Sequence, residues 1–335
     1  MKRELFVFAG QSNMMGASAL PPTHNLNIRD CTEYKFKSRL IGKNSGDFVP
    51  VTYECGEFIY KDMKEAYLNQ DEMGQSKLSD YQRTAYFAPS MCNSMGTSDK
   101  RCRPFSDFSE SFHQPAPSLA PYFCEQWEKL YGGASIAHIA KGSTKIEYFY
   151  TNDENEGSSE VFKGKCIAFF DDANKFYGED NIGKKTLIWL QGESNYADSV
   201  NKYLDKLNKL KDYADEIGFD KIMIIRVGYW FRKECSNIMK AQEIFCQQQE
   251  NCYIITRAIS LMPDNYIDCD NYFDWYTKMP EEKFRYCRDS VFGYENSHIN
   301  EAGFMIAAET AAKNAYLILK ENKPPLLEED LVRYI

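Results

Sequence analysis

Short apolar runs recur along the chain at wide intervals, and amphipathic helical patterns lie between them. Five of these runs predict strands, at residues 5–9, 135–140, 186–190, 221–227 and 252–256. Apolar positions at helical spacing predict four helices, at residues 118–130, 198–217, 236–250 and 300–321. This alternation predicts an α/β fold in which helices cover both faces of a parallel sheet.

Three long segments interrupt the alternation, each after the carboxyl end of a predicted strand: residues 17–117, 147–164 and 263–297. In the first we expect a small hairpin near residues 49–59 and a short helix after Lys61, with a separate small domain as the alternative. Long loops in a compact domain usually form the walls or lid of a site. We therefore expect one domain over residues 1–323, with an insertion at about 17–117, and a C-terminal tail over residues 324–335.

The composition is that of an ordinary protein with a hydrophobic core, and it argues against several partners. The 335 residues are 43% hydrophobic and 27% charged, and the net charge of −9 argues against nucleic acid and anionic membranes as partners. No stretch approaches the ~20 apolar residues of a membrane span, and the apolar run after Glu4 is too short for a signal peptide. The eleven cysteines show neither a CxxC pair nor a zinc-ligand spacing. We expect a cytoplasmic protein with reduced thiols and no bound metal.

The first predicted strand ends in Gly10-Gln11-Ser12-Asn13, where a polar turn follows the apolar run. Ligands bind at the carboxyl ends of the strands in open α/β sheets. Gly10 permits a tight turn, and Asn13 is suited to the start of the next helix. Ser12 is then either a helix cap or, if a base lies near it, a nucleophile.

Polar residues also follow the second and third predicted strands. Gly142 permits a backbone N–H to approach a ligand oxygen closely. Gln191 can direct its amide into the same crevice as Ser12, because the carboxyl ends of parallel strands share one edge of the sheet. The simpler interpretations are a buried, hydrogen-bonded carboxylate for Glu193 and a turn residue or helix cap for Asn195.

The candidate base must come from four histidines: His24, His113, His138 and His298. His138 lies in the middle of a predicted strand, where we expect a hydrogen-bonded core residue, and His24 and His113 lie in the first long segment. His298 immediately precedes the last predicted helix. Glu295, three residues earlier, is placed to hold the imidazole in the tautomer that a general base needs.

Taken in order, these blocks resemble the SGNH/GDSL hydrolases, and more narrowly the sialate O-acetylesterase and acetylxylan esterase group of carbohydrate esterases. The blocks are GQSNM at residues 10–14, AKGST at 140–144, WLQGESN at 189–195 and ExxH at 295–298. The resemblance covers most of residues 4–320, and GQSNM, WLQGE and ExxH are its specific parts. It implies a three-layer α/β/α fold around a flavodoxin-like, five-stranded parallel sheet with strand order 2-1-3-4-5.

The resemblance also implies roles for individual residues. Ser12 is the nucleophile, His298 is the general base, and the N–H groups of Ser12 and Gly142 form an oxyanion hole with the side chain of Gln191. The family pattern has an aspartate where this chain has Glu295. Either Glu295 orients His298, or the site is a Ser–His dyad, or its acid comes from elsewhere, such as residues 264–270 or 289.

Five further residues are expected to support the site or to contact the substrate: Gln11, Asn13, Glu193, Asn195 and Trp275.

The activity implied by the resemblance is that of a serine esterase that removes O-acetyl groups from carbohydrates through an acetyl-enzyme, without a cofactor. The 22 phenylalanines and 23 tyrosines, many of them in the long segments, favour a substrate with flat apolar faces such as a sugar ring. Two alternatives stay open: a carbohydrate O-acetyltransferase on the same scaffold, and a non-catalytic carbohydrate-binding homologue.

Overall fold

The central element of the structure is a seven-stranded, mostly parallel sheet. The structure is a computed structural model, and it describes residues 2–16, 24–36, 44–53, 55, 118–142, 144–152, 159–230, 233–260, 299 and 301–327. In spatial order the strands are β3 (Gly46–Pro50), β2 (Thr32–Phe36), β4 (Ala134–Ala140), β1 (Arg3–Gly10), β5 (Ile182–Leu190), β6 (Lys221–Ile225) and β9 (Cys252–Thr256). Within this sheet, as far as the structure describes it, β2 and β3 are the one antiparallel pair. A short second sheet joins β7 (Tyr229–Trp230) to β8 (Lys233–Glu234).

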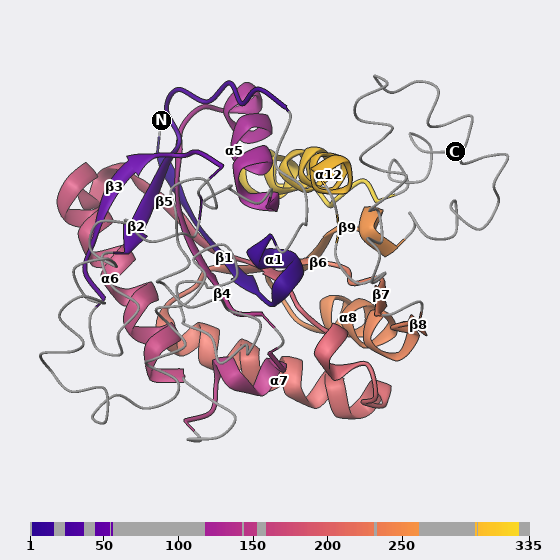
Figure 1. Ribbon diagram of the computed structural model, residues 1–335. Coiled ribbons are helices and arrows are strands. Elements are labelled where there is room, and N and C mark those ends of the chain that lie inside the picture. Colours follow the sequence, from indigo (N-terminus) through magenta and orange to yellow (C-terminus); the bar gives the residue numbers. More distant parts are fainter. Residues whose placement is uncertain are drawn as a thin grey trace, which may run out of the picture.

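Helices cover both faces of the large sheet. On one face lie α5 (Leu119–Leu130) and α12 (Glu301–Lys320), which pack against each other. On the other face lie α6 (Ser159–Tyr177), α7 (Val200–Ile217) and α8 (Ser236–Gln248), as Figure 1 shows. Short helical turns complete the described part: α1 (Ser12–Met15), η5 (Ile146–Phe149), η6 (Glu179–Asn181) and η7 (Glu193–Asn195).

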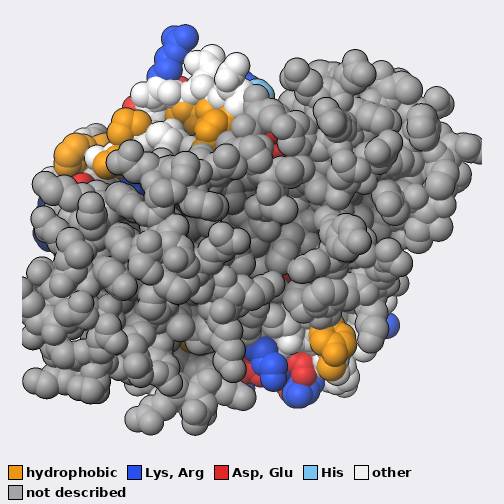
Figure 2. Space-filling view, in the orientation of Figure 1, with side chains coloured by type: hydrophobic (Ala, Val, Ile, Leu, Met, Phe, Trp, Pro, Cys, Tyr) orange, Lys and Arg blue, Asp and Glu red, His pale blue; other side chains and the backbone are white. Residues whose placement is uncertain are grey.

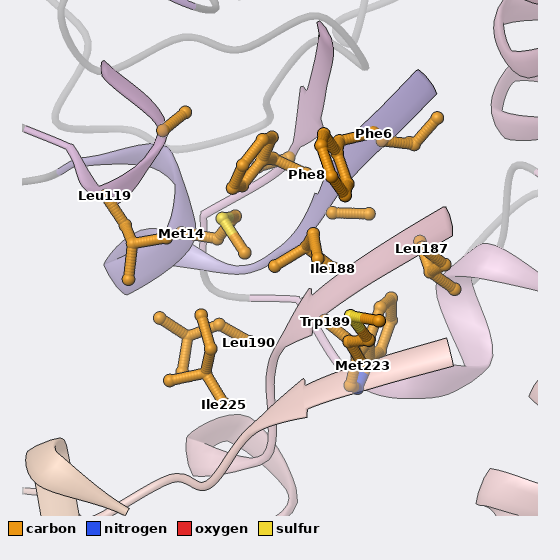
Figure 3. Close-up of a cluster of buried hydrophobic side chains, with 14 of the residues drawn as sticks. Phe6, Phe8, Met14, Leu119, Leu187, Ile188, Trp189, Leu190, Met223 and Ile225 are labelled. Carbon is orange, nitrogen blue, oxygen red and sulfur yellow. The ribbon is translucent and has the colours of Figure 1, made fainter. Parts of the chain in front are cut away.

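The core fills both faces of β1 and β5, whose apolar side chains are almost completely buried. Phe6 of β1 meets Phe123 of α5 edge to face, with the ring centroids 5.1 Å apart. On the opposite face, Trp189 of β5 meets Phe149 of η5 edge to face, with the ring centroids 4.8 Å apart. Figure 3 shows Met14 directed from α1 toward the side chains of β1 and β5. This short helix is therefore anchored to the core by an apolar side chain.

The five strands predicted from the sequence are all present, and in space they follow one another as β4, β1, β5, β6 and β9. The predicted sheet of five strands is wrong in its number, because β2 and β3 extend it to seven. The hairpin expected near residues 49–59 lies partly outside the described residues and stays a prediction; β3, which ends at Pro50, pairs with β2, which precedes it in the chain. The helix expected after Lys61 lies outside the described residues. The single-domain boundaries stay a prediction.

The sequence analysis missed α6, which begins inside the segment expected to be irregular. Its buried positions do follow a helical period, with Val161, Phe162, Cys166 and Phe169 among them. Lys165 lies among these positions and is fully buried over the ring of Phe36, with 4.1 Å between its ammonium nitrogen and the ring centroid. A charged residue at a core position breaks the apolar stripe by which such a helix is found.

A small aromatic patch lies at the edge of the sheet, far from α1. Phe48 of β3 packs against Phe176 and Tyr177 at the end of α6, with ring centroids 5.2 Å apart in both pairs, and Phe176 is 68% exposed. Figure 2 shows hydrophobic side chains gathered in the region of β3 and α6. Arg3, which begins β1, stacks on Tyr177, so the patch belongs to the amino ends of the parallel strands.

Among the described residues, no helix is both long and apolar enough to cross a membrane.

Candidate active site

Ser12 lies on a tight turn that joins the carboxyl end of β1 to α1. The turn begins where the Gln11 N–H donates to the carbonyl of Leu190 in β5 (3.1 Å). It ends at Gly16, which adopts a left-handed conformation and donates its N–H to the Ser12 carbonyl (3.0 Å). Ser12 is 4% exposed. The backbone before this serine is thus fixed to β5, and the backbone after it is closed by the turn of α1.

The turn requires glycine at position 10. The Gly10 backbone has a φ of +155°, and a Cβ at this position would lie 1.9 Å from the Leu190 carbonyl oxygen. No side chain fits in that space. Gly10 therefore permits the close approach of β1 and β5 from which the turn departs.

His138 supports the same turn from β4. Its Nε2 lies 2.8 Å from the carbonyl oxygen of Met14, so this nitrogen carries the hydrogen and donates it. Burial lowers the pKa of His138 to about 4, which keeps the imidazole neutral near pH 7. The structure agrees with the expectation that His138 is a hydrogen-bonded core residue.

Gly142 lies next to Ser12. The Lys141 N–H donates to the Gly10 carbonyl (3.0 Å), which continues the pairing of β1 with β4 beyond the last strand residues. A Cβ on Gly142 would lie 4.0 Å from the Cβ of Ser12 and 3.5 Å from the terminal methyl group of Met15. The structure thus brings together two of the residues expected to form the oxyanion hole.

Gln191 is the centre of a buried hydrogen-bond network. Its amide NH₂ lies within hydrogen-bond distance of three acceptors: the Thr144 carbonyl (3.0 Å), Asn195 Oδ1 (2.8 Å) and Gln11 Oε1 (3.2 Å). Its carbonyl oxygen accepts from the Tyr203 hydroxyl (2.8 Å). This amide joins the carboxyl ends of β1, β4 and β5 from within, a role that the sequence analysis did not foresee. Its oxyanion role stays a prediction.

Asn195 uses both ends of its amide to support the segments around Gln191. Its oxygen accepts from the Ile146 N–H (3.0 Å), and its nitrogen donates to Asp198 (2.8 Å) and Glu147 (3.3 Å). Both carboxylates also bind Lys206. Burial raises the pKa of each carboxyl, but the hydrogen bonds from lysine and Asn195 outweigh it, so both pKa values are lowered overall. Asn195 thus holds together the segments around Gln191.

Asn13 joins the nucleophile turn to two distant segments. Its side-chain nitrogen donates to Glu193 Oε1 (2.6 Å), and its side-chain oxygen accepts from the Ile299 N–H (3.1 Å). Glu193 is 1% exposed, and this burial raises the pKa of its carboxyl although the hydrogen bond from Asn13 opposes the change. Ile299 directly follows His298 in the sequence, so the candidate base is covalently attached to a residue bound beside Ser12.

Several predicted site residues lie outside the described part of the structure: His298, Glu295, Trp275 and the alternative acid Asp289. The described residues contain no group of three or more His, Cys, Asp and Glu side chains that could hold a metal ion. The absence of a cofactor stays a prediction.

Sequence reasoning missed two supporting residues, Tyr203 and Glu301. Tyr203 lies on α7, for which the sequence pattern predicts a helix and no polar role, and its hydroxyl contacts Gln191. Glu301 begins α12 and accepts from the Tyr122 hydroxyl (2.7 Å) and the His24 N–H (2.8 Å). Its position three residues after His298 of the ExxH block is the one signal that could have identified it.

No family model matches the sequence, and no curated protein matches it. Among solved structures, a protein from Arabidopsis thaliana is similar, with a TM-score of 0.50 and 12% identity over 95% of this chain and 98% of that one. NanS has a TM-score of 0.47 and 14% identity over 96% and 99% of the two chains. A carbohydrate acetylesterase from Xanthomonas citri has a TM-score of 0.45 and 8% identity over 95% and 56%. Only the first reaches a TM-score of 0.5, and at 12% identity it indicates a similar fold alone.

Proposed function

We propose that this protein is a serine esterase of the SGNH type that removes O-acetyl groups from carbohydrates. The observation that carries the proposal is the surroundings of Ser12. The serine begins α1 at the carboxyl end of β1, Gly142 lies beside it, and Asn13 binds the residue that follows His298. These are the parts that acyl transfer requires: a nucleophile, a place for the oxyanion and a route for a base to reach the nucleophile.

The reaction proceeds in two steps. His298 takes the hydroxyl proton of Ser12 as the oxygen attacks the acetyl carbonyl, and it then protonates the leaving sugar oxygen. A water molecule, deprotonated by the same histidine, attacks the acetyl-enzyme and releases acetate and the free serine. Every proton passes through one imidazole, so no cofactor is needed.

Negative charge on the carbonyl oxygen is stabilised by donors from two strands. The N–H groups of Ser12 and Gly142 are the donors in this proposal, and the amide of Gln191, which contacts Gln11 and the Thr144 carbonyl, joins the strand ends that carry them. Donors fixed before the reaction are worth more than mobile water, because no reorganisation is needed as the charge develops. Supporting this arrangement, the network around Gln191 is fully buried and engages both ends of its amide.

The substrate class follows from the sequence blocks and from the aromatic segment. Residues 263–297 contain Trp275 and eight further Tyr and Phe side chains, and flat aromatic faces stack on the apolar faces of sugar rings. In the sequence this segment follows β9 and ends directly before His298.

Acetate release from a panel of acetylated oligosaccharides, with an aryl acetate as a small control substrate, tests the proposal. The wild-type protein is expected to release acetate from at least one oligosaccharide, and Ser12→Ala is expected to release none. Ser199→Ala is the matched control, because Ser199 caps α7 through the Lys202 N–H (3.3 Å) and lies outside the site. Near-native hydrolysis by Ser12→Ala, or no release from any ester by the wild type, would overturn the proposal.

A further inference from the structure

Asn13 is the centre of a buried bridge between two segments that lie 180 and 286 residues away from it in the sequence. Asn13, Glu193 and Ile299 are 3%, 1% and 4% exposed, so solvent competes little for these hydrogen bonds. The two ends of an asparagine side chain differ, since the nitrogen only donates and the oxygen only accepts. The bridge therefore has a direction.

Glu193 sets this direction. The backbone N–H of Ile299 can only donate, so it needs the oxygen of Asn13. A carboxyl oxygen at position 193 accepts from the nitrogen of Asn13, and this hydrogen bond favours the orientation in which the oxygen of Asn13 faces the Ile299 N–H. Without an acceptor at this position, the buried NH₂ of Asn13 would lose this hydrogen bond, and the amide would be held less firmly in this orientation.

The bridge acts on the peptide group between His298 and Ile299. The N–H that Asn13 binds belongs to this planar group, and consecutive Cα atoms are about 3.8 Å apart. Two residues later the Glu301 carboxylate accepts from the Tyr122 hydroxyl of α5 (2.7 Å). The chain that follows His298 is thus fixed at two points, once to the nucleophile turn and once to α5.

We propose that Glu193 is a positioning residue: through Asn13 it fixes the peptide that follows His298, the residue we propose as the base. This inference rests on the proposed function and deepens it. The glutamate of the WLQGE block then acts on the base, through one intervening side chain, and makes no contact with substrate.

Steady-state kinetics with two variants test the inference. Glu193→Met removes both carboxyl oxygens at similar length, and we expect kcat to fall about 10- to 100-fold with little change in KM, since misplacing a catalytic group is costly. Glu193→Gln keeps an acceptor oxygen, and we expect it to recover kcat to within about fivefold of the wild type. A rise in KM at constant kcat in Glu193→Met would overturn the inference.

Glu4→Met is the matched control. Glu4 is 2% exposed and its carboxyl accepts from the Lys184 N–H (2.7 Å), but it lies at the opposite end of β1. We expect this variant to be less stable with an unchanged kcat. A fall in kcat equal to that of Glu193→Met would show that lost stability alone explains the effect, and it would overturn the inference.

Hydrogen exchange at the Ile299 amide, followed by NMR, reads the bridge without any substrate. We expect exchange at least about tenfold faster in Glu193→Met than in the wild type, and wild-type exchange in Glu193→Gln and Glu4→Met. If the wild type hydrolyses no ester, the proposed function fails, while the exchange rate still tests the bridge. Unchanged exchange in Glu193→Met would show that Glu193 does not hold this peptide.

If Glu193→Met does not fold, the donor and the acceptor can be exchanged instead. Asn13→Asp alone brings two carboxyl groups together and is expected to lower kcat. Adding Glu193→Gln returns a donor to the pair, and we expect the kcat of the double variant to be at least about tenfold higher than that of Asn13→Asp alone. Failure of the double variant to recover activity would overturn the inference.

Discussion

Replacing Gly10 with alanine tests how the fold holds Ser12. A Cβ on Gly10 would lie 1.9 Å from the Leu190 carbonyl oxygen, whereas real Cβ atoms essentially never come within 3.0 Å of such an atom. β1 and β5 must therefore move apart by about 1 Å at this point. The hydrogen bond from the Gln11 N–H to the same oxygen, now 3.1 Å, lengthens with them.

The cost follows from three contributions. An L-residue in this backbone conformation costs about 1–3 kcal/mol, the overlap with β5 costs about 1–3 kcal/mol, and the weakened hydrogen bond costs about 1 kcal/mol. Gly132 also has a positive φ, +125°, but a Cβ there would have no atom within 4 Å. Gly132→Ala carries only the first contribution. We therefore expect Gly10→Ala to be about 2–4 kcal/mol less stable than Gly132→Ala.

Urea unfolding of the two variants measures this difference, and hydrolysis of an aryl acetate measures its effect on the site. A shift of Ser12 by about 1 Å is expected to lower kcat about 100-fold in Gly10→Ala, with wild-type kcat in Gly132→Ala. If Gly10→Ala unfolds at the same urea concentration as Gly132→Ala and keeps its activity, the turn is not held in the way described.

Three further predictions concern the residues around the turn. Gln191→Ala removes the donor to three buried acceptors and one of the two acceptors of the Tyr203 hydroxyl, so we expect the free energy of unfolding to fall by about 2–4 kcal/mol and kcat by on the order of 10²–10³; a lower stability in urea with unchanged kcat would limit Gln191 to a supporting role. Glu295→Gln is expected to lower kcat by on the order of 10³–10⁴, with Glu295→Asp intermediate; nearly full kcat/KM in Glu295→Gln beside an inactive His298→Ala would place the acid elsewhere. Burial lowers the pKa of His138 from 6.5 to about 4, and between these values only the unfolded chain takes up this proton. The free energy of unfolding should therefore fall by roughly 3 kcal/mol as the pH drops through this range, and His138→Gln should abolish that loss in urea unfolding curves measured at several pH values.

Much of the sheet could be predicted because its central strands are continuous apolar runs. Residues 5–9 of β1 and 187–190 of β5 are buried on both faces, and no polar position interrupts these two runs. β2 could not be found in this way, because Glu33 and Lys35 are buried residues of this strand. In α6 the buried Lys165 has the same effect. Hydropathy identifies elements whose interior is apolar, and it misses those that bury a charged group.

The candidate site could be predicted at the level of strand ends and not at the level of hydrogen bonds. Gly10 and Ser12 were evident because a glycine and a polar turn follow an apolar run. The contact of Asn13 with Glu193 was not, because a separation of 180 residues leaves no local pattern. Gln191 was expected to direct its amide toward a ligand, whereas its donors and its acceptor meet protein atoms. Which polar groups face each other depends on packing, which a single sequence does not specify.

During turnover Ser12 is expected to carry an acetyl group. Rapid mixing with an activated aryl acetate, followed by acid quenching and mass analysis of the intact protein and its peptides, measures this directly. We expect an initial burst of aryl alcohol equal to the enzyme concentration and one added acetyl group on the peptide that contains Ser12. Ser12→Ala should show neither signal. A burst with the acetyl group on another residue, or steady hydrolysis by Ser12→Ala at the wild-type rate, would contradict the claim.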